Sequence, residues 1–337
     1  MTTNDLNSTD LLNLIIKADE GDSATMNMLH NYYSLEKYMT QKFDDGLIKV
    51  LTERANKNKP YSLLQLAIMH LTGLGLEQDF DKGIDLLKKS INAKCSHAYY
   101  FMAILVAANQ IDYEMTYDEL ISKAIDMNNS SALVQKGIEY SETNFKKSVE
   151  FYKKAIELDN DYAIYKLGEL YHDNKKYKLA IKFYRQAMDK NVDHAYFNLG
   201  VMYREGEGVK VDFEEAKKLL KKAMSLNNVR AITCIGELHH RSDNFEKAKK
   251  YYKLAIAKDD TLAKYNLGII YETEEKHKKA IKCFIGNAKD GHYESQEKLL
   301  YKYNVTDLDM TDDEIDEILA FHNTFKNFGA YDGFLRH

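Results

Sequence analysis

A constant spacing between two positions, occupied mostly by small residues, limits what this chain can fold into more than any other feature. Ala216 is followed by Ala231 after fifteen residues, and the same distance recurs in eight places. The eight pairs are Leu47 and Ser62, Gly83 and Ala98, Tyr117 and Ala132, Ser148 and Ala163, Ala180 and Ala195, Ala216 and Ala231, Ala248 and Ala263, and Ala280 and Ser295. A repeat of 31–36 residues cannot bury its own apolar face, so neighbouring repeats must stack to form a core.

The half of each repeat that has this constant length shows the pattern of a helix. One copy reads Ala216-x-x-Leu219-Leu220-x-x-Ala223, which places apolar residues three and four positions apart. Aromatic residues recur at the position of Leu220, and this series predicts core residues: Tyr152, Tyr184, Tyr252 and Phe284. Eleven positions after the first residue of each copy, a further series predicts left-handed residues that end the helix: Asn128, Asp159, Asn191, Asn227, Asp259 and Gly291.

The other half of each repeat varies in length and predicts a helix followed by a turn. It contains Leu199-Gly200-x-x-Tyr203 in one copy and related sequences in others. Glycine inside a helix costs about 0.5–1 kcal/mol relative to alanine. We therefore expect a neighbouring helix to approach closely at these glycines: Gly168, Gly200 and Gly268. Two copies have a turn that is four residues longer, in which glycines with positive φ are predicted: Gly73, Gly75, Gly206 and Gly208.

The segment Ala195-x-x-x-Leu199-Gly200-x-x-Tyr203-x-x-Gly206-x-Gly208 resembles the repeat of the Sel-1-like branch of the tetratricopeptide superfamily. The resemblance covers residues 24–295, where the shorter copies lack the Gly-x-Gly turn and are closer to a shortened tetratricopeptide repeat. It implies an all-α fold, an α-α superhelical solenoid of about eight to nine stacked helix-turn-helix repeats. It also implies a non-catalytic scaffold or adaptor, because members of this superfamily assemble many unrelated protein partners.

Both ends of the chain depart from the repeat and predict capping segments. Residues 1–23 are expected to form an N-terminal tail and a capping helix over 9–19, and residues 296–337 to form C-terminal capping helices and an aromatic tail. Thr311-Asp-Asp-Glu314 has the pattern of a capping box at the start of a helix. The aromatic tail is open to two interpretations, a cap over the core or an element for docking or self-association: Phe325, Phe328, Tyr331 and Phe334.

Composition and charge argue against several classes of function. The chain has 47 basic and 52 acidic side chains, and its net charge of −5 disfavours a nucleic-acid partner. Three cysteines without a C-x-x-C pair, and the lack of other catalytic motifs, predict no metal, no cofactor and no enzyme activity.

The expected compartment follows from what the sequence does not contain. No signal peptide is visible, and the longest apolar run, residues 98–108, is too short to cross a membrane. We therefore expect a cytoplasmic protein without a membrane partner. A single proline with abundant Asn, Lys, Ile and Tyr is typical of AT-rich genomes, as in some intracellular bacteria and large DNA viruses, for which the compartment would be the host cytoplasm.

In superhelices of the family that the chain resembles, the first helix of each repeat lines the concave side, so its non-core positions are candidates for binding a protein or peptide. The candidates combine aromatic rings, amides and both charges: Tyr162, Tyr165, Glu169, His194, Phe197, Asn198, Arg230, Glu237, Tyr265 and Asn266. The alternative is single-stranded RNA, but Glu169, Glu237 and the net charge argue against it. Binding of a C-terminal carboxylate, as in chaperone-binding tetratricopeptide domains, is disfavoured because Glu169 stands where those domains have a clamp residue.

Overall fold

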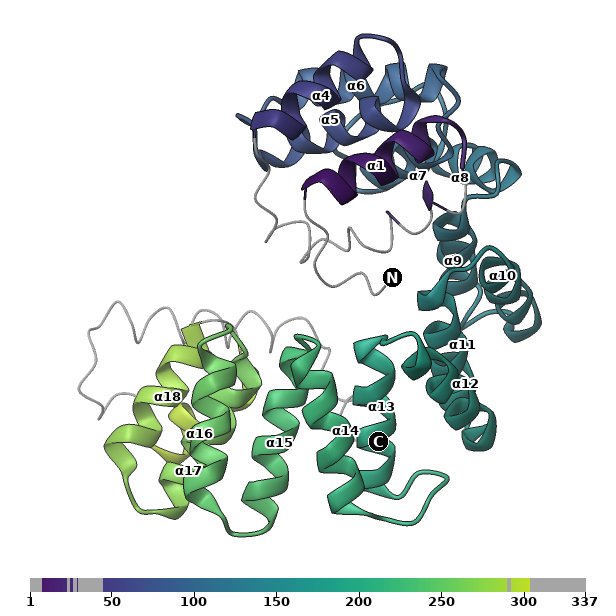
Figure 1. Ribbon diagram of the computed structural model, residues 1–337. Coiled ribbons are helices and arrows are strands. Elements are labelled where there is room, and N and C mark those ends of the chain that lie inside the picture. Colours follow the sequence, from purple (N-terminus) through teal and green to yellow (C-terminus); the bar gives the residue numbers. More distant parts are fainter. Residues whose placement is uncertain (1–7, 23–24, 27–28, 30–44, 290–291, 304–337) are drawn as a thin grey trace. The chain divides into compact units, whose positions relative to one another are not determined.

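The computed structural model describes residues 8–22, 25–26, 29, 45–289 and 292–303, and every regular element in these ranges is a helix (Figure 1). This confirms the predicted all-α fold. The chain forms two compact units, unit 1 (Met1–Val192) and unit 2 (Asp193–His337). The boundary between them falls inside the repeat region, directly before the first helix of one repeat.

Unit 1 consists of helices that pair in chain order. The first helices of its repeats are α5 (Pro60–Thr72), α7 (Ser96–Ala107), α9 (Ser130–Glu139) and α11 (Asp161–Asp173). The second helices are α6 (Phe80–Asn92), α8 (Tyr117–Asp126), α10 (Phe145–Glu157) and α12 (Tyr177–Asp189). Two helices precede them, α1 (Ser8–Asp19) and α4 (Asp45–Ala55), and both pack on α5. The second helices α6, α8 and α10 each pack on the first helix of their own repeat and on that of the next, which is the stacking that the repeat requires.

Unit 2 continues the same arrangement. Its first helices are α13 (Asp193–Glu205), α15 (Val229–Arg241) and α17 (Thr261–Thr273), and its second helices are α14 (Phe213–Ser225), α16 (Phe245–Ile256) and α18 (His277–Lys289). A short helix, α19 (Tyr293–Glu297), continues as a π-helical turn, η1 (Lys298–Lys302). Consecutive first helices contact each other more extensively than consecutive second helices do. The first helices are therefore the inner layer of unit 2, and the second helices are its outer layer.

The turns after the second helices contain the predicted left-handed residues. The φ angles of this series lie between 56° and 69°: Asn128, Asp159, Asn191, Asn227 and Asp259. A short polar side chain tolerates this conformation better than most others do. In the two longer turns four glycines have φ between 69° and 78°, as predicted: Gly73, Gly75, Gly206 and Gly208.

In the first helices that contain a glycine, from α9 to α17, this glycine makes room for a side chain of the second helix in the same repeat. A Cβ atom added there would lie only 2.5–3.0 Å from a buried side chain: Gly168 from Tyr184, Gly200 from Leu220, and Gly268 from Phe284. The predicted close approach is thus confirmed. The predicted core series is also buried: Tyr152, Tyr184, Tyr252 and Phe284.

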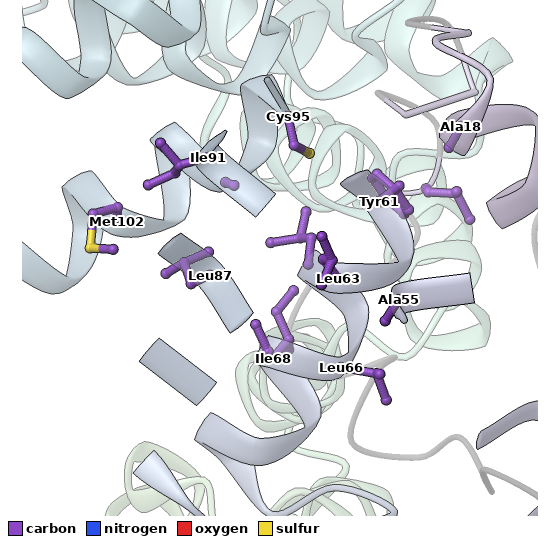
Figure 2. Close-up of a cluster of buried hydrophobic side chains, with 14 of the residues drawn as sticks. Ala18, Ala55, Tyr61, Leu63, Leu66, Ile68, Leu87, Ile91, Cys95 and Met102 are labelled. Carbon is purple, nitrogen blue, oxygen red and sulfur yellow. The ribbon is translucent and has the colours of Figure 1, made fainter. Parts of the chain in front are cut away.

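The N-terminal end of unit 1 has one large apolar cluster, in which α5 is central (Figure 2). Helix α1 coincides with the helix predicted over 9–19, and its last residue, Asp19, ties it to α5. Asp19 Oδ1 accepts hydrogen bonds from the backbone N–H groups of Tyr61 (2.8 Å) and Ser62 (2.9 Å). Asp19 Oδ2 accepts from the Ser62 hydroxyl (2.6 Å) and from Arg54 Nε (2.8 Å). This carboxylate therefore caps the N-terminus of α5, whose own N-cap residue, Lys59, makes no side-chain cap.

Three predictions concern segments outside the described residues. They are the remainder of the repeat that begins at Ala24, the capping box at Thr311–Glu314, and the aromatic tail over 325–334. The left-handed residue predicted at Gly291 also lies outside them. These expectations stay predictions.

Candidate protein-binding surface

The ten candidate residues lie on four first helices. In unit 1, α11 carries Tyr162, Tyr165 and Glu169. In unit 2, the candidates are His194, Phe197 and Asn198 on α13, Arg230 and Glu237 on α15, and Tyr265 and Asn266 on α17. We call the side of α13, α15 and α17 that carries these seven residues the inner face of unit 2.

One carboxylate on the inner face joins three first helices. Glu237 of α15 forms an ion pair with Arg204 of α13, through Arg204 Nη1, and accepts a hydrogen bond from Asn266 Nδ2 of α17 at 3.3 Å. The Arg204 side chain is only 14% exposed, and its Nε lies 2.6 Å from Glu205 Oε1. Glu237 therefore links neighbouring repeats to each other. The sequence reasoning missed Arg204, although its opposite charge and its spacing from Glu237, close to one repeat, were a usable signal.

Arg230 is the exposed cation of the inner face. Its guanidinium Cζ lies 4.8 Å from the centroid of the Phe197 ring, which is a cation–π contact. Among the described residues no carboxylate forms an ion pair with Arg230. Its N–H donors are therefore available to a partner, while the contact with Phe197 restricts the position of the guanidinium.

The thiol one turn after Arg230 does not add chemistry to this face. Cys234 is buried, and burial together with the charge of Glu237 raises the pKa of the thiol to about 11. Burial likewise raises the pKa of the Cys95 and Cys283 thiols. Thiols in such surroundings are unreactive at neutral pH. Within the described ranges, no three His, Cys, Asp or Glu side chains cluster so that they could hold a metal ion.

The remaining candidates of unit 2 lie at the two edges of the inner face. His194 is exposed, and its Nδ1 lies 2.9 Å from Asp193 Oδ1, while Asp193 Oδ2 accepts a hydrogen bond from Asn228 Nδ2 at 2.9 Å. Asn198 is half-buried on α13. Tyr265 is half-buried and packs its ring 5.0 Å from the His292 ring.

The candidates of unit 1 make their polar contacts within a single helix, α11. Glu169 of α11 accepts a hydrogen bond from the Tyr165 hydroxyl at 2.7 Å and another from Lys166 Nζ at 2.6 Å. Lys166 Nζ also lies 5.5 Å from the centroid of the Tyr162 ring. Burial and the bond to Glu169 raise the pKa of Tyr165. Burial alone would lower the pKa of Lys166, but the bond to Glu169 raises it, so this lysine is charged at neutral pH.

Two candidates are not where the sequence reasoning placed them. Tyr165 and Phe197 were expected at non-core positions, but they are only 4% and 5% exposed. Both rings point toward the second helix of their repeat: Tyr165 stacks on Tyr184, with centroids 6.2 Å apart, and Phe197 packs in a cluster with Leu220. The expectation that they lie outside the core is therefore wrong. Their contribution is to support Tyr162 and Arg230, the more exposed side chains beside them.

Two exposed apolar residues of unit 1 were missed. Ile104 of α7 and Ile138 of α9 are each 38% exposed. Each follows the small residue of its first helix, Ala103 or Gly137, as Glu237 follows Gly236 in α15. The repeat register alone could have identified them, because it assigns them to the same position as Glu237.

Comparison with known proteins agrees with the two types of repeat. The sequence pattern described as "Sel1 repeat" matches residues 60–95 and 193–228, the two copies with a Gly-x-Gly turn. The pattern described as "Tetratricopeptide repeat" matches residues 130–162, 161–189, 229–257 and 262–285. Among proteins of curated function, none matches this sequence. In the described residues no helix has both the length and the apolar character needed to cross a membrane.

Two solved structures have a similar fold. A protective antigen present in uropathogenic Escherichia coli strains, which displays an SLR fold, is 18% identical, with 96% of this chain and 72% of that chain aligned at a TM-score of 0.51. A Sel1 repeat protein from Oxalobacter formigenes is 17% identical, with 69% of this chain and 96% of that chain aligned at a TM-score of 0.52. At these identities the likeness concerns the fold alone.

Proposed function

Because this chain belongs to the Sel1-like repeat proteins of the tetratricopeptide-like superfamily, which generally act as protein-interaction scaffolds, we propose that it is a non-catalytic adaptor that binds a protein segment on the inner face of unit 2. Repeat folds of this kind present a continuous surface made of equivalent positions on successive helices. The partner is expected to be an extended or helical peptide segment of another protein.

The observation that carries this proposal is the state of Arg230. Arg230 is exposed, its guanidinium lies over the Phe197 ring, and it has no ion-pair partner among the described residues. A cation held in place in this way loses little conformational freedom on binding, so its hydrogen bonds contribute more to affinity. Backbone carbonyl groups or an acidic side chain of the partner are the acceptors that it fits.

The spacing of the first helices fits an extended segment. Packed helices lie about 8–10 Å apart, and an extended chain rises about 3.3 Å per residue. One contact every three residues would place successive side chains of the partner near Asn198, Arg230 and Asn266. A segment of roughly seven residues would therefore cover all three helices of the inner face.

Peptide display on phage tests the proposal without a known partner. A random library of peptides of about twelve residues would be selected on the full chain, and the affinity of the selected peptides would be measured by calorimetry. Arg230→Glu reverses the charge of an exposed residue without disturbing the core. It should weaken binding by at least about tenfold, which corresponds to about 1.4 kcal/mol.

A matched control changes an equally exposed charge on the outer layer. Lys221→Glu on α14 makes the same charge change at a residue that has no ion pair among the described residues, and it should leave the affinity unchanged. If Arg230→Glu binds the selected peptides as tightly as the unchanged chain does, the inner face of unit 2 is not the binding site. Loss of binding in Lys221→Glu instead would assign the site to the outer layer.

A further inference from the structure

The first turn of α18 differs in charge from the first turns of the other second helices of unit 2. The residues at its second and third positions change from acidic to basic along the unit: Glu214 and Glu215 in α14, Glu246 and Lys247 in α16, and Lys278 and Lys279 in α18. The first turn is the positive end of the helix dipole, where carboxylates stabilise a helix and lysines destabilise it. Helix α18 therefore lacks a stabilising charge that α14 and α16 possess.

The exposed lysines of α18 also pair with no carboxylate in the described part of the chain. Lys278 and Lys282 are exposed, lie one helical turn apart on the same face, and form no ion pair within the described part of the chain. Lys218 of α14 occupies the position of Lys282, and its Nζ lies 3.5 Å from Glu215 Oε2. Helix α18 contains four lysines and no acidic residue. The outer layer of unit 2 is therefore most basic at its last helix.

The described chain ends beside this same turn. The ring of Tyr303, the last described residue, lies 6.2 Å from the ring of His277, which begins α18. Glu272 of α17 holds Tyr303 there, because its Oε1 accepts a hydrogen bond from the Tyr303 hydroxyl at 2.6 Å. The same carboxylate pairs with Lys298 at 2.8 Å and with Lys302 at 3.0 Å. The last described side chain is thus held next to the first turn of α18.

The sequence that follows has the charge that α18 lacks. Residues 304–337 contain eight acidic and two basic side chains, and seven of the acidic ones fall within 307–317. Asp307 follows Tyr303 by four residues, a reach of about 13 Å when extended. The eleven residues of the acidic segment span about 36 Å when extended and about 16 Å as a helix. Lys278 and Lys282, about 6 Å apart along the axis of α18, lie within reach in either case.

We propose that the acidic segment 307–317 of this chain docks on the first turn of α18, where its carboxylates pair with Lys278 and Lys282. The segment supplies the negative charge that Glu214 and Glu246 supply in α14 and α16. It also neutralises the most basic part of the outer layer. The occupant of this surface is therefore the same chain rather than another anionic molecule.

Zero-length crosslinking tests the contact directly. A carbodiimide joins a lysine amine to a carboxylate only when the two groups touch, and mass spectrometry of the digested full chain identifies the joined residues. Crosslinks from Lys278 or Lys282 to residues 307–317 are expected. The pair Lys249 and Glu274, 2.7 Å apart, is the internal positive control. An equal mixture of 15N-labelled and unlabelled chains distinguishes contacts within one chain from contacts between two copies.

Two outcomes would overturn the proposal. The first is the absence of crosslinks between α18 and 307–317 in a sample in which Lys249 and Glu274 are joined. The second is that labelled peptides are joined to unlabelled ones as often as to labelled ones, because the occupant would then be a second copy. Crosslinks confined to labelled–labelled and unlabelled–unlabelled pairs support the proposal.

Hydrogen exchange of α18 gives a second test, in which the sign of the effect decides. Lys278→Glu restores the acidic first turn of α14 and α16, so without docking it should slow exchange in residues 277–289. With docking, the new glutamate repels the acidic segment, and exchange should be about two- to fivefold faster. The triple variant Asp312→Asn, Asp313→Asn and Asp316→Asn removes three of the seven acidic charges of the segment. In that background Lys278→Glu should slow exchange in α18 instead of speeding it.

The matched control for hydrogen exchange is Lys250→Glu on α16. Lys250 is exposed and without an ion pair in the described ranges, and the charge change is the same. Exchange in α18 should not respond to it. Slower exchange of α18 in Lys278→Glu, in the chain with its natural acidic segment, would contradict the docking.

Discussion

Helices α11 and α15 share the tripeptide Gly-Glu-Leu at the same place in their repeats, yet their glutamates make different contacts. Glu169 of α11 is satisfied by Tyr165 and Lys166 of its own helix. Glu237 of α15 is satisfied by α13 and α17, the first helices before and after it. The same motif therefore serves one helix in unit 1 and three helices in unit 2.

Two neighbouring positions explain the difference. Where α11 has Lys166, α15 has Cys234, which offers Glu237 no cation on its own helix. The first helix before α15 is α13, which carries Arg204. The first helix before α11 is α9, and the equivalent residue there is Ser141, just after the end of α9. A carboxylate at this position pairs with whichever cation the local repeats supply. The motif places the charge, and the adjacent residues decide whether it stabilises a helix or a stack of repeats.

The largest effect is expected from the glycine that precedes each glutamate. A Cβ atom at Gly236 would lie 2.5 Å from Tyr252 Cε1, and one at Gly168 would lie 2.8 Å from Tyr184 Cδ1. Alanine improves helix propensity by about 1 kcal/mol, but overpacking costs about 1–3 kcal/mol, and both tyrosine rings are fully buried. Gly236→Ala should therefore lower the urea midpoint of unfolding, followed by circular dichroism, and Gly168→Ala should lower it less. A higher midpoint for Gly236→Ala would show that the helix register in α15 is wrong.

Substituting the two glutamates should lower the free energy of unfolding by unequal and smaller amounts. Glu237→Gln removes the negative charge that pairs with the largely buried Arg204 across the repeats, leaving only a neutral acceptor, and should cost about 1–2 kcal/mol. Glu169→Gln should cost less than about 1 kcal/mol, because its partners lie on the same helix and Tyr165 can still donate to the amide oxygen. Denaturation of both variants measures the difference. A double-mutant cycle with Arg204→Met should give a coupling of roughly 0.5–3 kcal/mol with Glu237 and none with Glu169.

The smallest effect concerns pH and a third glutamate. Glu272 of α17 stands at the position that Arg204 occupies in α13, and it holds Lys298, Lys302 and Tyr303. Burial opposes ionisation, but the hydrogen bonds from these donors lower the pKa of the Glu272 carboxyl. A carboxyl with a lowered pKa stabilises the folded state at neutral pH. Its contribution is lost as the pH falls from about 4.3, the usual value for glutamate, through the lower value in the folded state.

Protection factors from hydrogen exchange in residues 292–303 should therefore fall a few-fold between neutral pH and about pH 3.5. Glu272→Gln should remove most of that pH dependence, since the amide does not titrate. Exchange in α15 serves as the comparison, because Glu237 has no contact with this segment. An unchanged pH dependence in Glu272→Gln would show that another group controls it.

The repeat pattern was sufficient to predict the helix pairs, the left-handed residues such as Asn191, and the close approach at Gly200. These features depend on residues near one another in sequence or at a constant spacing. The first helices that carry the candidates were also predicted. The burial of Phe197 was not, because the residue two positions after the small one faces the second helix, which only the packing of the pair reveals.

Contacts between distant or non-equivalent residues escaped the sequence reasoning altogether. Asp19 caps α5 from a separation of 42 residues to Tyr61, and no spacing rule connects the two. The link from Arg204 to Glu237 needs two side chains in successive repeats to point toward each other. Such pairs become visible only once the helices are stacked in three dimensions.

The link at Glu237 has a mechanical consequence. Stretching a stack of repeats pulls its neighbouring first helices apart. In unit 2, Arg204, Glu237 and Asn266 connect three of these helices. Extension must break charged contacts there in addition to sliding apolar surfaces past one another. In α11 the carboxylate and its partners would travel together on one helix and offer no such resistance. Unit 2 should therefore be stiffer against uncoiling around α15 than unit 1 is around α11.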